Sequence, residues 1–215
     1  IYGCKPHGSF KSFFGNTRKD GLHAPSECGS FWYRWLSSED HFASSASLDE
    51  NGKMHLRAET VRAQRASRCD AFVFKNLNAG QRLQLIASVF PEALLIWCRR
   101  DFSDTVASIV KARNTLGIGA GEFWSIRPRD WLELLSLSEE DMVQQQVERL
   151  EQQIIDDLAL FPENQVIELD YDMWRRDVEQ TVALLEDFIE VPLRSGLADE
   201  GLRELPCYFE QRNAS

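Results

Sequence analysis

An apolar segment that ends in two arginines constrains the fold of this chain more than any other feature. Residues 93–98 are apolar without interruption, Arg99 and Arg100 follow, and a helical pattern starts near Ser103. Such a run is typical of a strand buried on both faces, as in a parallel sheet. Open α/β sheets bind ligands at the carboxyl ends of their strands. Arg100 and Ser108 are therefore placed to hold a phosphate group from two sides.

This segment resembles the part of sulfotransferases that binds the 3′-phosphate of their nucleotide. That family shows Phe-Pro-x-Ala before an apolar strand, then Arg-Asp-Pro, and a serine that follows the arginine at the same spacing as here. Residues 90–93 read FPEA, Arg100 and Asp101 follow the strand, and Phe102 stands in the place of the proline. The resemblance implies that Arg100 and Ser108 bind the 3′-phosphate.

A glycine-rich loop at the start of the chain resembles a second part of that family. Residues 3–9, GCKPHGS, fit the pattern G-x-x-x-x-G-[ST]. Such a loop lets backbone N–H groups approach a phosphate, although an ordinary turn is the alternative. Pro6 and His7 replace the family's Arg-Ser, so Lys5 or Lys11 is expected to supply the positive charge. The resemblance implies 5′-phosphosulfate binding by this region, with the candidate residues Gly3, Lys5, Gly8, Ser9, Phe10 and Lys11.

Glu27 is the first candidate for the catalytic base. Several sulfotransferases carry a glutamate in a similar place, and a carboxylate can take the proton of an attacking acceptor oxygen. The alternative is that Glu27 only caps the helix that follows, because acidic residues favour helix N-termini. His7 and His23 are rival bases.

Lys75 is the other catalytic candidate. It follows residues 71–74, AFVF, which predict a short buried strand. The family often shows a lysine after such a strand, and the resemblance implies that Lys75 contacts the sulfate or the acceptor. The alternative is a solvated lysine at a sheet edge. Tyr171 and Asp172 resemble the family's Tyr-Glu-Asp, which implies a structural role beside the cofactor.

Strand and helix patterns alternate along the chain. Residues 37–58 are serine-rich and polar, with Asn51-Gly52 as a turn signal, and predict a loop. The expected strands are 1–4, 22–25, 71–74, 93–98 and 166–169. The expected helices are 10–18, 31–36, 78–89, one from Ser103, one over about 143–161, and 178–189.

Helices that separate strands imply crossover connections and a parallel sheet. We therefore expect one α/β domain over residues 1–215, with three α/β/α layers around a central parallel sheet. The resemblance implies that this is the P-loop-like nucleotide-binding fold of sulfotransferases. The sequence begins with Ile1 rather than Met, which is compatible with further residues upstream, including a signal or an anchor.

Composition narrows the classes of partner. A net charge of −10 argues against nucleic-acid binding, which needs a basic face. No apolar run approaches the roughly 18 residues of a membrane span. The five cysteines lack zinc-site spacing, and no metal is expected. Cys98 is expected to be a buried thiol, and the cysteine pattern favours a reducing, cytoplasmic location.

These features predict a sulfotransferase. The resemblance implies transfer of a sulfuryl group from 3′-phosphoadenosine 5′-phosphosulfate (PAPS) to a hydroxyl or amine, leaving adenosine 3′,5′-bisphosphate. Small-molecule, carbohydrate and peptide acceptors all stay open. A P-loop kinase or NTPase is the alternative, although the Gly-Lys-Ser/Thr ending and a clear magnesium-binding acid are missing. Pro6 and His7 also allow a degenerate, non-catalytic nucleotide-binding protein.

Overall fold

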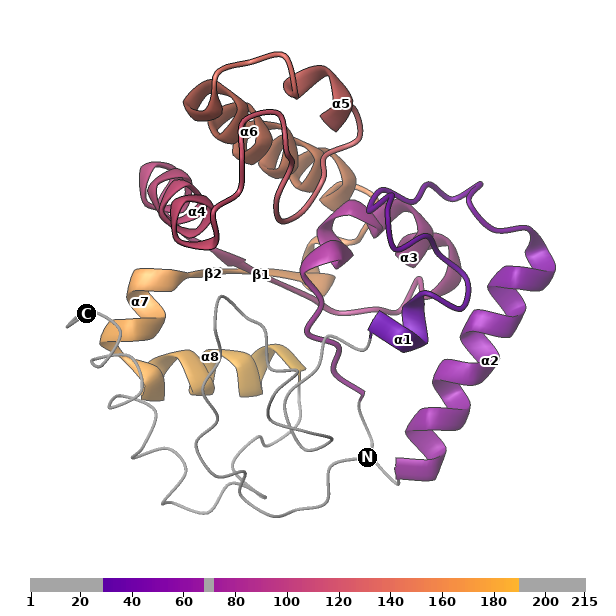
Figure 1. Ribbon diagram of the computed structural model, residues 1–215. Helices are drawn as coiled ribbons and strands as arrows, with labels where there is room; N and C mark the ends of the chain where they lie inside the picture. The colour runs from indigo at the N-terminus through magenta and orange to yellow at the C-terminus, as the bar shows by residue number, and fades with distance from the viewer. Residues whose placement is uncertain (1–28, 68–71, 190–215) are drawn as a thin grey trace.

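The computed structural model describes residues 29–67 and 72–189, drawn as coloured ribbon in Figure 1. These residues form helices and two strands, β1 (Leu95–Arg99) and β2 (Val166–Asp170). The helices, including the short 3₁₀ segments η2 and η3, are α1 (Gly29–Trp32), α2 (Glu50–Ser67), η2 (Leu77–Gln81), α3 (Leu83–Val89), α4 (Phe102–Leu116), α5 (Trp131–Leu134), α6 (Glu139–Leu158), η3 (Glu163–Gln165), α7 (Tyr171–Arg176) and α8 (Val178–Ile189).

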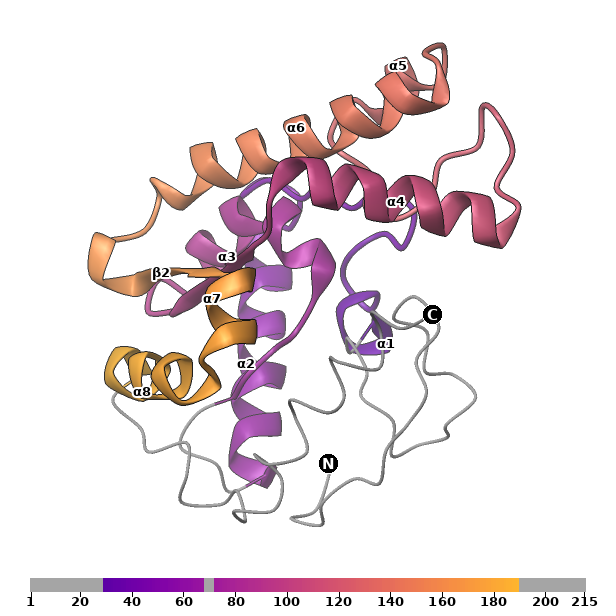
Figure 2. The same cartoon turned by 90° about the vertical axis from the view of Figure 1, so that its left-hand side faces the viewer.

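The two strands are parallel neighbours, as the sequence predicted. Their register runs from Leu95 opposite Val166 to Arg99 opposite Asp170. Helices α4 and α6 lie above the strands and α7 and α8 lie below them (Figures 1 and 2). The described residues thus contain mostly helix with a small parallel sheet. The larger central sheet and its three layers stay a prediction.

Burial along β1 differs from the expectation. Ile96 is 40% exposed and Cys98 is also exposed, whereas Leu95 and Trp97 are half-buried. Successive side chains of a strand point to opposite faces, so one face of β1 is packed and the other is open. The predictions of a strand buried on both faces and of a buried Cys98 are therefore wrong.

Helices α4, α6 and α8 confirm the periodic patterns of the sequence. Asp101 accepts a hydrogen bond from the backbone N–H of Asp104 at 2.9 Å and so caps α4. Gly117 ends the helix with φ 67°, a left-handed conformation that glycine adopts without strain. Met142 and Val143 of α6 are buried in a cluster against which residues of α4 pack.

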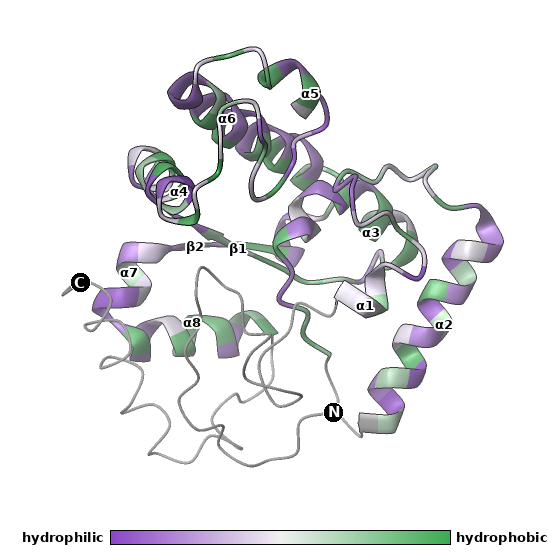
Figure 3. Cartoon of the chain, viewed as in Figure 1, coloured by the Kyte–Doolittle hydropathy of each residue, from purple (hydrophilic) through white to green (hydrophobic). Residues whose placement is uncertain are grey.

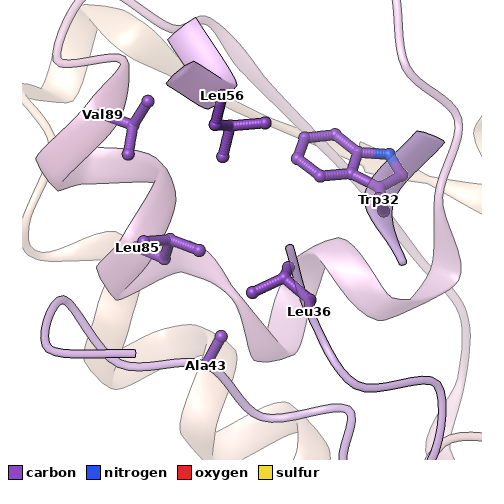
Figure 4. Close-up of a cluster of buried hydrophobic side chains, with 6 residues drawn as sticks. All are labelled: Trp32, Leu36, Ala43, Leu56, Leu85 and Val89. Atoms are coloured by element: carbon purple, nitrogen blue, oxygen red, sulfur yellow. The ribbon is translucent and has the colours of Figure 1, made fainter. Parts of the chain in front are cut away.

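Helix α2 corrects the prediction of a loop over residues 37–58. Asp49 Oδ1 accepts a hydrogen bond from the N–H of Gly52 at 2.7 Å, so the Asn51-Gly52 pair lies in the first turn of a capped helix. Leu56 is buried in a cluster whose labelled side chains are drawn in Figure 4. Hydrophobic and hydrophilic residues alternate along α2, as Figure 3 shows. An amphipathic helix needs apolar residues on one face only, so the polar composition of this segment led to the prediction of a loop.

Residues 72–76 form no strand, so the prediction of a buried strand before Lys75 is wrong. Val73 is 77% exposed. Phe74 packs through its ring, whose centroid lies 5.0 Å from that of Trp32 in α1. The segment is held by aromatic contacts to α1 and not by the ladder hydrogen bonds that define a strand.

Two predicted helices are shorter than expected. The helix expected over residues 78–89 is broken into η2 and α3, with Arg82 between them. Helix α1 ends at Trp32, and a turn follows it where the pattern predicted helix to residue 36. In both places the apolar residues still face the cluster of Figure 4, so the sequence indicated the buried side correctly.

Candidate functional site

The carboxyl edge of the sheet brings together two segments that lie far apart in the sequence. Arg99 pairs with Asp170 at the last position of the register, so Arg100 and Tyr171 leave the strands side by side. The guanidinium carbon of Arg100 lies 5.2 Å from the centroid of the Tyr171 ring. This is the edge at which open α/β sheets bind ligands.

Arg100 is oriented but retains donors for a ligand. Its Nη2 donates to Asp104 Oδ2 at 3.1 Å, and the side chain is 39% exposed. Its Nε is buried and makes no hydrogen bond within residues 29–67 and 72–189. A guanidinium has five N–H donors in a planar fork that suits a phosphate group. The ion pair with Asp104 therefore positions the fork without occupying all of it.

Ser108 lies on the same face of α4 as the carboxylate that holds Arg100. Residues four apart on a helix are neighbours on its surface, so Ser108 follows Asp104 by one turn. The Ser108 side chain is exposed. Ser108 therefore lies one turn beyond the carboxylate that binds Arg100, and the two-sided grip of Arg100 and Ser108 on a phosphate stays a prediction.

A second arginine approaches the same ring, and the sequence reasoning missed it. The guanidinium carbon of Arg175 in α7 lies 5.7 Å from the Tyr171 ring centroid. One turn of helix separates Arg175 from Tyr171, so helical spacing after β2 was the signal that could have revealed it. Two cationic side chains therefore lie against the Tyr171 ring at this edge.

Lys75 lies elsewhere than expected, because no strand precedes it. It is exposed in the irregular segment that leads into η2. Its contact with sulfate or acceptor stays a prediction.

The remaining predicted site residues lie outside the part of the chain that the structure describes. They are Gly3, Lys5, His7, Gly8, Ser9, Phe10, Lys11 and Glu27. Within residues 29–67 and 72–189, no group of three or more His, Cys, Asp or Glu side chains is arranged to hold a metal ion.

A comparison with known protein families shows the family to which this chain belongs. The family model of the sulfotransferases, described as "Sulfotransferase family", matches residues 9–195. The chain belongs to the sulfotransferase family. The matched range includes Glu27, Lys75, Arg100 and Ser108, and it begins at Ser9, at the end of the glycine-rich loop. The search of curated proteins and the search of solved structures gave no match to this sulfotransferase.

Family membership supports sulfotransfer as the general activity, in agreement with the prediction from the residues. None of the helices in the described ranges of this sulfotransferase has the length and apolarity needed to cross a bilayer.

Proposed function

We propose that this sulfotransferase moves the sulfuryl group of PAPS to a hydroxyl or amine acceptor within a single domain. The observation that supports the proposal is the position of Arg100 at the carboxyl edge of the sheet, where it binds Asp104 one turn before Ser108 on α4. The partly exposed guanidinium of Arg100 and the exposed Ser108 hydroxyl would suit a 3′-phosphate. The glycine-rich loop of residues 3–9 would receive the 5′ end of the same nucleotide.

The reaction needs a base and stabilisation of the leaving group. The acceptor oxygen or nitrogen attacks sulfur in line, its new bond to sulfur forms, and the bond between sulfur and the 5′-phosphate oxygen breaks. The acceptor proton passes to Glu27, with His7 and His23 as rivals. Lys75 stabilises the charge that develops on the departing adenosine 3′,5′-bisphosphate. The acceptor is a small molecule, a carbohydrate or a peptide side chain.

Nucleotide selectivity tests the donor. Calorimetry with adenosine 3′,5′-bisphosphate, ADP, ATP and GTP in parallel should give binding of the first that is roughly 10- to 100-fold tighter than that of ADP, because one charge-assisted contact contributes about 1.5 to 3 kcal/mol. Equal affinity for adenosine 3′,5′-bisphosphate and ADP would contradict the proposed donor. Tighter binding of ATP or GTP would favour a kinase or NTPase.

A further inference from the structure

Arg82, between η2 and α3, is buried, and none of its guanidinium nitrogens makes a well-formed hydrogen bond to the described residues, although the Tyr33 side chain is a polar neighbour that acts on it. The residue is 2% exposed, and its Nε, Nη1 and Nη2 make no hydrogen bond within the described ranges 29–67 and 72–189. Its guanidinium carbon lies 5.9 Å from the centroid of the Tyr33 ring. Burial lowers the pKa of Arg82 and outweighs the opposite effect of Tyr33. A buried charge is normally paired, because removing it from water is costly.

Arg113 is a buried arginine with a structural role and serves as a comparison for Arg82. Arg113 is 1% exposed, and each of its nitrogens has a partner. Nε donates to Glu139 at 2.8 Å, and Nη1 and Nη2 donate to the carbonyls of Glu122 and Gly119 at 2.8 and 3.1 Å. Arg82 is buried to a similar extent, but its nitrogens make no such hydrogen bonds to the described residues.

Further polar atoms without partners lie beside Arg82. Both amide atoms of Gln81 are buried and make no hydrogen bond to any described residue, and the same is true of Trp32 Nε1. Figure 4 shows the indole nitrogen of Trp32 on the edge turned away from Leu56 and Leu85. Gln81, the sequence neighbour of Arg82, thus adds a buried amide without a hydrogen bond to the described residues.

Arg82 also acts on His41, together with a second arginine, Arg127. The pKa of His41 is lowered by burial and then by the charges of Arg127 and Arg82, although Asp40 opposes this. His41 Nδ1 accepts a hydrogen bond from the backbone N–H of Arg127 at 2.9 Å. The charges of Arg82 and Arg127 thus both act on this imidazole, with Asp40 acting in the opposite sense and Glu39 paired to Arg127.

We propose that Arg82, together with the Gln81 amide, forms a second oxyanion site that binds a sulfate, phosphate or carboxylate group. The planar guanidinium offers paired donors to such a group, and the amide N–H adds a third. Tyr33, whose ring lies 5.9 Å from the guanidinium carbon, is 43% exposed, so we propose that an anion reaches Arg82 from the side of this ring. Assignment of this anion to the reactants rests on the proposed function, whereas the site itself stands on the geometry of Arg82.

Sulfate-dependent stability tests the site without any enzyme assay. Thermal unfolding is followed with sodium sulfate and with sodium chloride at equal ionic strength, for the wild type, Arg82→Met and Arg113→Met. Sulfate also stabilises proteins generally by exclusion from their surface, and Arg113→Met measures that background in a protein with a comparable loss of buried charge. Arg82→Met should weaken sulfate affinity roughly 10-fold or more, since a charge-assisted contact is lost.

The salt-free melting temperatures supply the second readout. Removal of an unpaired buried charge should leave Arg82→Met as stable as the wild type or more stable, whereas Arg113→Met should melt well below it. If Arg82→Met is as destabilised as Arg113→Met and keeps the wild-type response to sulfate, Arg82 is a structural residue and the site does not exist. Arg82→Lys, which retains the charge but loses the fork, should restore only part of the sulfate response.

Adenosine 3′,5′-bisphosphate distinguishes the two sources of the anion. If Arg82 binds the sulfate–phosphate end of the donor, Arg82→Met weakens nucleotide binding, and bound nucleotide competes with sulfate. If Arg82 binds an acidic group of the acceptor, nucleotide affinity is unchanged, and sulfate still binds to the nucleotide complex. Either result supports the site. Loss of nucleotide selectivity in the wild type would reject the proposed donor and leave the sulfate result intact.

Discussion

At the scale of single residues, Arg99 and Arg100 show how neighbours of the same type take different roles. Arg99 is the last residue of β1, and its Nη1 donates to Glu168 on the adjacent strand at 3.3 Å. Arg100 has left the strand and binds Asp104 at the start of α4. Arg99, which contacts the neighbouring strand, stabilises the sheet. Arg100, at the edge of the sheet, is placed to meet a ligand.

This difference predicts the effects of two alanine substitutions. Arg100→Ala should weaken the binding of adenosine 3′,5′-bisphosphate roughly 10- to 100-fold, because a charge-assisted contact to phosphate is lost. Arg99→Ala is the matched control and should leave nucleotide affinity within about twofold, since an exposed ion pair contributes at most about 1 kcal/mol to stability. Calorimetry measures both. Equal losses in the two variants would show that general charge, and not the position of Arg100, governs binding.

Glu27 carries the second prediction at this scale, from the sequence alone. Glu27→Gln keeps the shape of the side chain and removes its basicity, so turnover should fall by about 10² to 10⁴ while nucleotide affinity barely changes. Sulfate transfer from labelled donor, together with thermal melting, checks both effects. A variant with normal turnover and stability lowered by about 1 kcal/mol or less would make Glu27 a helix cap and direct attention to His7 and His23.

At the scale of elements, the strongest periodic patterns were the most informative. Helices α4 and α6 and strand β2 could be read from the spacing of apolar residues and from their caps. Helix α2 could not, because Asn51-Gly52 resembles a turn and its apolar content is low. The signal that could have identified it is Asp49 as a helix cap. Residues 71–74 were predicted as a strand because they are apolar and aromatic. These aromatic residues instead pack against α1.

The residues of the candidate site also differ in how far the sequence could predict them. The positions of Arg100 at the strand–helix junction and of Ser108 on the following helix could be predicted from their spacing along the chain, whereas their contact with a phosphate stays a prediction. The approach of Arg175 and Tyr171 to Arg100 depends on the register of β1 and β2, which no local pattern specifies. That the Arg82 guanidinium makes no well-formed hydrogen bond to the described residues depends on contacts between distant segments, so the sequence does not reveal it either.

The cap of α2 gives the prediction at this scale. Asp49→Ala removes the acceptor of the Gly52 N–H and should lower the free energy of unfolding by about 1 kcal/mol. Denaturant unfolding followed by circular dichroism measures the loss. Asn51→Ala, an exposed change in the same turn, is the control and should cost less than about 0.5 kcal/mol. If the two variants are equally stable, the Asp49 cap does not support α2.

At the scale of the whole molecule, polar contacts between distant segments add to the apolar packing that joins the elements. Arg113 joins α4 to the start of α6 through Glu139. Gln146 of α6 donates to the carbonyls of Trp124 and Ile126 at 3.0 and 2.8 Å and holds the loop before α5. His41 extends this network to the segment between α1 and α2. Of the side chains named in these contacts, His41 is the one whose type changes charge near neutral pH.

The titration of His41 makes the stability of the fold depend on pH. Burial lowers its pKa below the ordinary value of 6.5, and the charges of Arg127 and Arg82 lower it further. Between 6.5 and the lowered native value, the unfolded chain binds more protons than the folded one, so stability falls as pH decreases through this window. The neutral imidazole also keeps Nδ1 free to accept the hydrogen bond from the backbone N–H of Arg127, which protonation would break.

We therefore expect denaturant unfolding between pH 7.5 and pH 5 to show less loss of stability in His41→Asn than in the wild type. Asparagine places an acceptor near the position of Nδ1 and does not titrate, so the contact to Arg127 is kept while the proton linkage is removed. At pH 7.5 the two proteins should be of similar stability. A variant that loses as much stability on acidification as the wild type would show that His41 is not the group that couples this network to pH.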